Sequence, residues 1–116
     1  MSPEKELHSR VCASLNGYQS HGLLRYTATK REAVRGLKWG KQAQQTGFAA
    51  GLPDFIIWTR SGQTIFIELK APKTGKLSEK QEQWRDWLKS ADFQWHEACY
   101  LKDVEAIVDA ALGVMK

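Results

Sequence analysis

Two β-rich runs joined by a short polar turn constrain the fold of this chain more than any other feature. The first run covers residues 54–59 and the second covers residues 63–70. Three-residue hairpin loops favour glycine at their third position, in the left-handed conformation, and Gly62 is the third residue between these runs. The sequence therefore predicts an antiparallel β-hairpin in which Thr59 pairs with Gln63.

This register places two carboxylates opposite each other at the open end of the hairpin. When the pairing is counted along the ladder from Thr59 and Gln63, Asp54 comes to lie opposite Glu68. A two-residue turn would instead pair Asp54 with Leu69, whose side chain points to the other face. Directly opposed residues have Cβ atoms roughly 5 Å apart, where two carboxylates repel each other unless a cation or a shared proton intervenes. Because Asp and Glu oxygens suit Mg²⁺ or Mn²⁺, the hairpin predicts a divalent-metal site.

Lys70 lies two residues after Glu68, so the two side chains point to the same face of the strand. An ammonium group beside a carboxylate-bound metal can orient an attacking water and stabilise negative charge on a phosphate. The alternative interpretation is an ordinary ion pair at the edge of a sheet, since such pairs are common on protein surfaces.

The N-terminal segment predicts a helix that begins at Pro3 and ends at Gly17. Its apolar positions recur at helical spacing: Leu7, Val11 and Leu15. On a helical wheel of about 100° per residue, Glu4 falls inside this apolar stripe and Glu6 falls outside it. A carboxylate on a core-facing stripe usually has a partner. An acid in the first turn can also simply complement the helix dipole, so both interpretations of Glu4 stay open.

Further elements are predicted on both sides of the hairpin: a weak strand over residues 23–28, a second helix, and a strand over residues 93–101. Ser78 and Gln81 have the spacing of a capping box that opens the second helix. Gln81 is therefore either a site residue or only a capping residue. The apolar face predicted for this helix comprises Trp84, Trp87, Leu88 and Ala91. Asp103 is predicted to cap a last helix, and this order of elements favours an α/β fold with a mixed sheet covered by helices.

The formal net charge of the 116-residue chain is +4, and residues 29–45 alone account for it. Glu32 is the one acid in this segment. We interpret residues 29–50 as a loop with a short helix near residues 30–35. Its basic residues are Lys30, Arg31, Arg35, Lys38 and Lys41. Such a segment is typical of a phosphate-binding surface, and a solvated charged face is the alternative.

Composition excludes several other classes. With 42% hydrophobic and 26% charged residues the chain is too apolar for disorder, and its length predicts a single domain. It has no apolar run of about 18 residues, which argues against a membrane span. Cys12 and Cys99 form no metal-binding pair, so we expect two free thiols in a reducing cytosol.

Three short motifs together resemble the VRR-NUC domain, the virus-type replication-repair branch of the PD-(D/E)XK nuclease superfamily. They are Gly51-Leu-Pro-Asp54, Ile67-Glu-Leu-Lys70 and Gly75-Lys-Leu-Ser78, the last followed by Gln81. The resemblance extends from about Glu4 to Leu101. It implies a restriction-endonuclease-like fold, with a mixed central sheet, and a DNA endonuclease that depends on Mg²⁺ or Mn²⁺.

The resemblance also implies roles for individual residues. Lys70 corresponds to the catalytic lysine, and Gln81 to a glutamine that supports the site. The implied metal ligands are Asp54, Glu68, the backbone carbonyl of Leu69, and Glu4. Glu6 is the alternative to Glu4 as the acid of the first helix.

Small stand-alone members of this family are phage-like, form homodimers and act on branched DNA such as four-way junctions, which implies a bacterial or phage-infected cytosol. The predicted DNA contacts are Lys30, Arg31, Arg35, Lys38, Lys41, Lys73 and Lys76. Two other function classes remain open at this point. One is a non-catalytic nucleic-acid-binding module on the same fold, and the other is a small interaction protein in which Glu68 and Lys70 form only a salt bridge.

Overall fold

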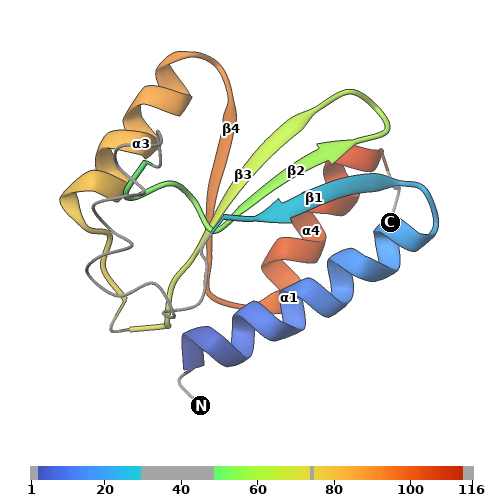
Figure 1. The fold of residues 1–116 in the computed structure, drawn as a ribbon, viewed down its shortest axis with the longest axis horizontal. Coiled ribbons are helices and arrows are strands. Elements are labelled where there is room, and N and C mark those ends of the chain that lie inside the picture. Colours follow the sequence, from blue (N-terminus) through green and yellow to red (C-terminus); the bar gives the residue numbers. More distant parts are fainter. Residues whose placement is uncertain (1–2, 30–48, 74, 114–116) are drawn as a thin grey trace.

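The computed structural model describes residues 3–29, 49–73 and 75–113, which form an α/β fold with a mixed four-stranded sheet (Figure 1). The strands lie in the order β1-β2-β3-β4; β1, β2 and β3 are antiparallel neighbours, and β3 and β4 are parallel. The elements are α1 (Pro3–Ser20), β1 (Leu24–Ala28), β2 (Phe55–Thr59), β3 (Thr64–Leu69), α3 (Glu79–Ser90), β4 (Gln94–Ala98) and α4 (Leu101–Leu112). This order agrees with the order predicted from the sequence.

The predicted hairpin register is confirmed. Strand β2 pairs with β3 so that Phe55 lies opposite Ile67, and the pairing continues residue by residue to Trp58 opposite Thr64. The Thr59 amide donates to the Gln63 carbonyl at 2.9 Å. Gly62 adopts the left-handed conformation that the turn requires, with a φ of 92°.

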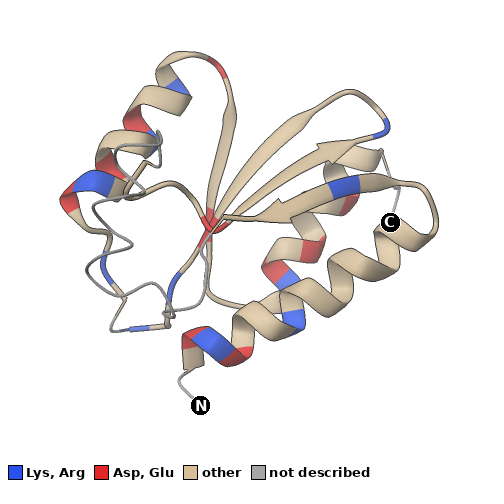
Figure 2. Ribbon diagram, viewed as in Figure 1, with Lys and Arg blue, Asp and Glu red and all other residues tan. Residues whose placement is uncertain are grey.

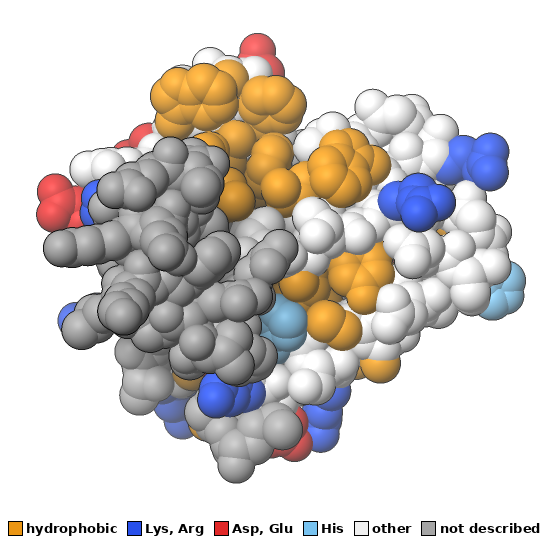
Figure 3. Space-filling model, viewed as in Figure 1, with side chains coloured by type: hydrophobic (Ala, Val, Ile, Leu, Met, Phe, Trp, Pro, Cys, Tyr) orange, Lys and Arg blue, Asp and Glu red, His pale blue; other side chains and the backbone are white. Residues whose placement is uncertain are grey.

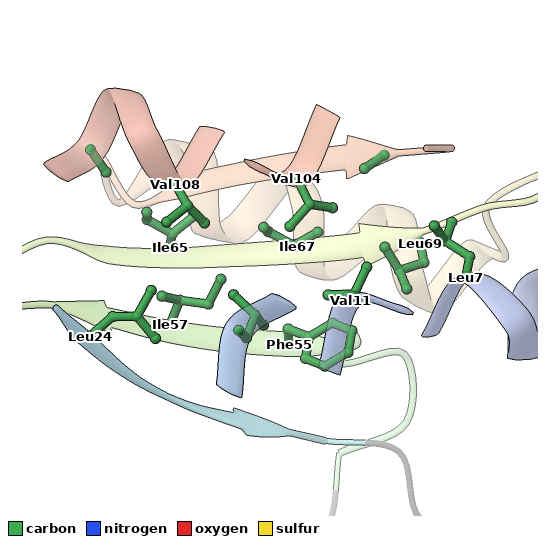
Figure 4. Packing of buried hydrophobic residues seen from close by; sticks show 13 residues of the cluster. Leu7, Val11, Leu24, Phe55, Ile57, Ile65, Ile67, Leu69, Val104 and Val108 are labelled. Carbon is green, nitrogen blue, oxygen red and sulfur yellow. The ribbon is translucent and has the colours of Figure 1, made fainter. Parts of the chain in front are cut away.

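One face of the sheet packs against α1 and α4 and forms the hydrophobic core (Figure 4). Alternate residues of β2 and β3 point into this core, among them Phe55, Ile57, Ile65, Ile67 and Leu69. Since neighbouring residues of a strand point to opposite faces, Glu68 and Lys70 face the other side of the sheet, toward α3. The alternation of side chains that directs one set of residues into the core therefore also directs Glu68 and Lys70 to the candidate site.

Helix α1 does not end at Gly17, as the sequence predicts, but continues to Ser20. Its last turn is held by packing on α4, where the Tyr18 hydroxyl donates to Asp109 Oδ1 at 2.7 Å. This contact offsets the roughly 1 kcal/mol that a glycine costs inside a helix. The chain reverses direction at Gly22, whose φ is 74°.

The boundary between β4 and α4 was also predicted wrongly. Strand β4 ends at Ala98 and α4 begins at Leu101, with Tyr100 as an N-cap that makes no side-chain hydrogen bond. Asp103 lies in the first turn of α4 and does not cap it. Leu101 packs against the core at helical spacing from Val104, so burial of this leucine extends the helix toward the N-terminus.

Helix α3 buries a narrower stripe than predicted. Gln81 and Leu88, two turns apart, are its buried residues, whereas Trp87 is 60% exposed. Trp84 is half-buried, and Ala91, the C-cap, is exposed. Trp87 and Ala91 belong to the apolar face predicted from helical spacing, but only a narrow part of that face contacts the sheet.

Two other predictions concern the cysteines and membrane-spanning helices. Cys12 and Cys99 are both free thiols, as predicted. Within the described ranges, no helix has the length and apolarity that a membrane crossing requires. Residues 30–48 lie outside the described part of the chain. They hold most of the loop predicted over residues 29–50, including its short helix and its five basic residues.

Candidate functional site

Two buried carboxylates meet at the open end of the β2–β3 hairpin. Asp54 immediately precedes β2, and the pairing of Phe55 with Ile67 continues by one step to bring Asp54 opposite Glu68. Asp54 is 3% exposed and Glu68 is 1% exposed. Figure 2 shows acidic positions at the end of the sheet where β2 and β3 converge. Charges are rarely buried to this extent without compensation, so the arrangement points to function.

A hydrogen bond holds each of these carboxylates in place. Asp54 Oδ2 accepts from the Leu69 backbone amide at 2.8 Å. Glu68 Oε2 accepts from Gln81 Nε2 at 2.9 Å. Each bond engages one oxygen, so a carboxylate can accept it and ligate a cation at the same time.

Gln81 caps α3 and also contacts a carboxylate of the candidate site. Its Oε1 accepts from the Ser78 amide at 2.8 Å, and Ser78 Oγ accepts from the Gln81 amide at 3.2 Å, which completes the capping box. Its Nε2 donates to Glu68. The first turn of α3 is thereby connected to the carboxylate of β3.

Two glycines allow the loops around the site to approach its backbone closely. Gly51 has a φ of 86°, and a Cβ there would lie 2.7 Å from the Lys80 carbonyl carbon and 2.9 Å from the Gln81 amide nitrogen. A Cβ on Gly75 would lie 2.7 Å from the Ala71 carbonyl oxygen. The glycines of two of the motifs are therefore required by close packing.

Lys70 and Glu4 lie at the same end of β3 as the two carboxylates. Lys70 is only 8% exposed, and its backbone amide donates to the Ala98 carbonyl at 3.0 Å, which extends the β3–β4 pairing. Glu68 and Lys70 are both buried, so the alternative interpretation of an ordinary surface ion pair does not fit them. Glu4 Oε1 accepts from the Ala71 amide at 3.3 Å, next to Lys70.

Glu6, the alternative to Glu4, points elsewhere. It forms an exposed pair with Arg10 at 3.3 Å, one turn along α1. Glu4 is therefore the acid of the first helix that the fold brings to the end of β3.

The sequence analysis did not identify Glu97 as a neighbour of the site. The parallel pairing of β3 with β4 brings Glu97 beside Glu68 on the same face, although Glu97 is exposed. Strand pairing between segments so far apart along the chain leaves no local signal in the sequence.

The donor set at this site fits a hard divalent cation, because it consists of carboxylate and backbone oxygens. Asp54 and Glu68 would be its carboxylate ligands. Among the residues described, no group of three or more His, Cys, Asp or Glu side chains is arranged to hold a metal ion. A metal here would therefore rely on the two carboxylates together with other oxygen ligands, such as backbone carbonyls and water.

Two of the predicted DNA-binding residues lie in the described part of the chain. Lys73 and Lys76 are exposed and lie in the connection between β3 and α3, a few residues after Lys70. Figure 2 shows lysines along this connection. The remaining five, Lys30, Arg31, Arg35, Lys38 and Lys41, lie outside the described residues.

Comparison with known proteins identifies the family of the chain and agrees with its fold. The sequence model of the VRR-NUC domain matches residues 4–100. A solved structure described as a VRR_NUC domain protein is similar in fold, with a TM-score of 0.67 and 14% sequence identity. The match covers 98% of this chain and 91% of that one. No curated protein matches the sequence.

Proposed function

The chain belongs to the VRR-NUC family of nuclease domains, and from that premise we propose that it is a metal-dependent endonuclease that hydrolyses DNA phosphodiester bonds. The observation that carries this proposal is the burial of Asp54 and Glu68 at facing positions, each carboxylate held by a hydrogen bond. Buried acids without a function destabilise a small domain, since desolvating each charge costs several kcal/mol, of order 3 or more.

The residues that would hold Mg²⁺ or Mn²⁺ are Asp54, Glu68 and the backbone carbonyl of Leu69, with Glu4 as a further acid at the same end of β3. When bound, such a metal lowers the pKa of a coordinated water and offsets negative charge on the phosphate. The Leu69 amide fixes the orientation of the Asp54 carboxylate, because its hydrogen bond to Oδ2 is 2.8 Å long. Gln81 does the same for Glu68.

Lys70 acts on the attacking water and on the phosphate. Its side chain shares a face with Glu68, its backbone amide donates to the Ala98 carbonyl, and a Cβ built on Gly75 would lie 3.0 Å from the Lys70 Cβ, so the loop packs closely against this residue. An ammonium group held in this way orients water and contributes to charge stabilisation as the phosphate becomes more negative.

DNA is held through its phosphates. Lys73 and Lys76 follow the catalytic lysine on an exposed connection, and the five basic residues of segment 30–41 add to this positive charge. Contacts of this kind position the substrate without reading its bases. The proposal therefore includes no sequence preference.

The preferred substrate is branched DNA such as a four-way junction, and the working form is a homodimer. A 116-residue chain offers limited surface for a four-armed substrate. A two-fold symmetric dimer doubles the basic surface and presents two cleavage sites. Sedimentation at micromolar concentration tests this part, and a purely monomeric protein would contradict it while leaving single-site cleavage intact.

A cleavage panel tests the activity itself. Linear duplex, single-stranded, flap and four-way junction DNA are each incubated with the protein in Mg²⁺, Mn²⁺ or EDTA. We expect cleavage that requires the metal and is lost in Asp54→Ala. If the protein binds DNA in EDTA but cleaves none of the substrates with either metal, it is instead a non-catalytic binding module.

A further inference from the structure

An exposed aromatic side chain lies near two arginines, on the face of the sheet that carries the candidate site. Trp58 of β2 is 46% exposed. It pairs directly with Arg25 of β1, so their side chains share a face. Arg60 follows in the hairpin turn, where its Nε donates to the Gly22 carbonyl at 2.8 Å. Figure 3 shows hydrophobic side chains next to Lys and Arg side chains on this face of the molecule.

The three residues line an open groove of about 660 Å³ at the β1 edge of the sheet. The other lining residues, from the end of α1 and from β1 and β2, are uncharged. Among the residues described, no carboxylate forms an ion pair with Arg25 or Arg60. The groove therefore combines an aromatic surface with positive charge and fits a polyanion.

The groove extends to the α1 side of the sheet, and Trp58 connects it with the face that carries the candidate site. Trp58 is four residues from Asp54 along β2, so both side chains point the same way and lie about 13 Å apart along the strand. The positions between them, Ile56 and its partner Thr27, are part-buried and exposed respectively.

We propose that Trp58, Arg25 and Arg60 bind an unpaired stretch of the DNA substrate. This inference rests on the proposed function, which it extends by naming the part of the substrate that contacts this groove. Indole rings stack on bases of any type, but only where a base face is not already covered by its neighbours in a duplex. Guanidinium groups bind phosphate oxygens in a bidentate manner, which suits the flanking positions of the two arginines.

Equilibrium binding in EDTA tests the aromatic part without any cleavage. Fluorescence anisotropy is measured with a labelled single strand and with the same sequence as a closed duplex. We expect Trp58→Ala to weaken binding of the single strand about tenfold and to leave duplex binding nearly unchanged. Trp58→Phe keeps a stacking ring and should restore most of the affinity. Trp87→Ala removes another exposed tryptophan, on α3, and is the matched control.

The salt dependence of binding tests the arginines. Single-stranded nucleic acid releases about 0.7 counterion per neutralised phosphate, so Arg25→Ala with Arg60→Ala should reduce the slope of log K against log salt by about 1.4. The control double variant, Arg10→Ala with Arg85→Ala, removes the same charge from residues that pair with carboxylates. It should leave the slope unchanged.

Two results would overturn the inference. One is a Trp58→Ala protein that binds single strands as the native chain does. The other is a Trp58→Ala protein that loses its oligomeric state in sedimentation while each protomer keeps its affinity, which would make the groove a protein interface. Failure of the proposed function is a separate result, because the native chain would then cleave none of the DNA substrates with either metal, or Asp54→Ala would cleave as the native chain does, whatever the Trp58 variants do.

Discussion

Gln81 joins the cap of α3 to the buried carboxylate of Glu68. The two ends of its amide have different partners: Oε1 accepts from the Ser78 amide at 2.8 Å, and Nε2 donates to Glu68 Oε2 at 2.9 Å. Any movement of the first turn of α3 therefore changes the orientation of a proposed metal ligand. Because only one end of the amide is a donor, substitutions can separate the two roles.

Gln81→Glu should preserve the cap and disrupt the site. The new carboxylate still accepts from Ser78, but it places a second negative charge against Glu68. We expect a loss of about 1–3 kcal/mol in the free energy of unfolding near neutral pH. Repulsion raises one pKa of the pair above its unfolded value, so the loss should shrink as the pH falls toward about 5. Urea unfolding at both pH values measures this.

Gln81→Ala removes both hydrogen bonds and is expected to be destabilising at either pH, which distinguishes it from Gln81→Glu. Gln83→Ala is the matched control, since Gln83 is exposed on the same helix. A Gln81→Glu protein whose stability relative to the native chain does not change with pH would contradict the assigned contact with Glu68.

Gly51→Ala should be strongly destabilising. Its φ of 86° is strained for any other residue, and a Cβ would come within 2.9 Å of the Gln81 amide nitrogen, where backbone must move. We expect the free energy of unfolding to decrease by about 2–4 kcal/mol. Cleavage should also decrease, because the same loop carries Asp54.

Gly17→Ala is the opposite case and the control. Gly17 lies inside α1, and a Cβ there would have no atom within 4 Å. This substitution should stabilise the protein by about 0.5–1 kcal/mol. Thermal unfolding measures the Tm of both variants. Equal changes in Tm would contradict the close approach of Gly51 to α3.

Local patterns in the sequence were enough to predict the hairpin, its register and the capping box. Gly62 and the spacing of the two runs fix the register, and this register places Asp54 opposite Glu68. Alternation along β2 and β3 then decides which residues enter the core. These features depend on neighbours within about 15 residues of one another.

Features that depend on distant packing could not be predicted in this way. Helix α1 passes Gly17 because Tyr18 bonds to Asp109 on α4, which is 91 positions away. The neighbour relation of Glu68 and Glu97 depends on the parallel pairing of β3 with β4. The contact between Gln81 and Glu68 was implied only by resemblance, since the capping box by itself explains the glutamine.

Metal binding should be measurable by its effect on stability, independently of cleavage. A ligand that binds only the folded state at a hundred times its Kd adds about 2.7 kcal/mol to the free energy of unfolding. We expect Mn²⁺ to raise the Tm of the native chain and to have a much smaller effect on Asp54→Asn or Glu68→Gln.

Glu4→Gln and Glu6→Gln form a matched pair for the first helix. Glu4 reaches the Ala71 amide, whereas Glu6 pairs with Arg10 on the surface. The Mn²⁺ effect should therefore weaken in the Glu4 variant and persist in the Glu6 variant. An identical response of both variants would remove Glu4 from the proposed ligands.

His96 of β4 should make the protein less stable in mild acid. Burial, and to a lesser degree the positive charge of Lys89, lower the pKa of this histidine below its ordinary value of 6.5. As the pH falls through 6.5, the unfolded chain takes up the proton first, so the free energy of unfolding decreases until the pH reaches the lower pKa of the folded state.

His96→Gln should flatten this decrease. Lys89→Gln should flatten it only in part, because burial remains. Urea unfolding between about pH 7.5 and pH 5, above the range where most carboxylates titrate, measures the slopes. Equal slopes in the native chain and in His96→Gln would show that this histidine takes up its proton equally well in the folded and unfolded chains.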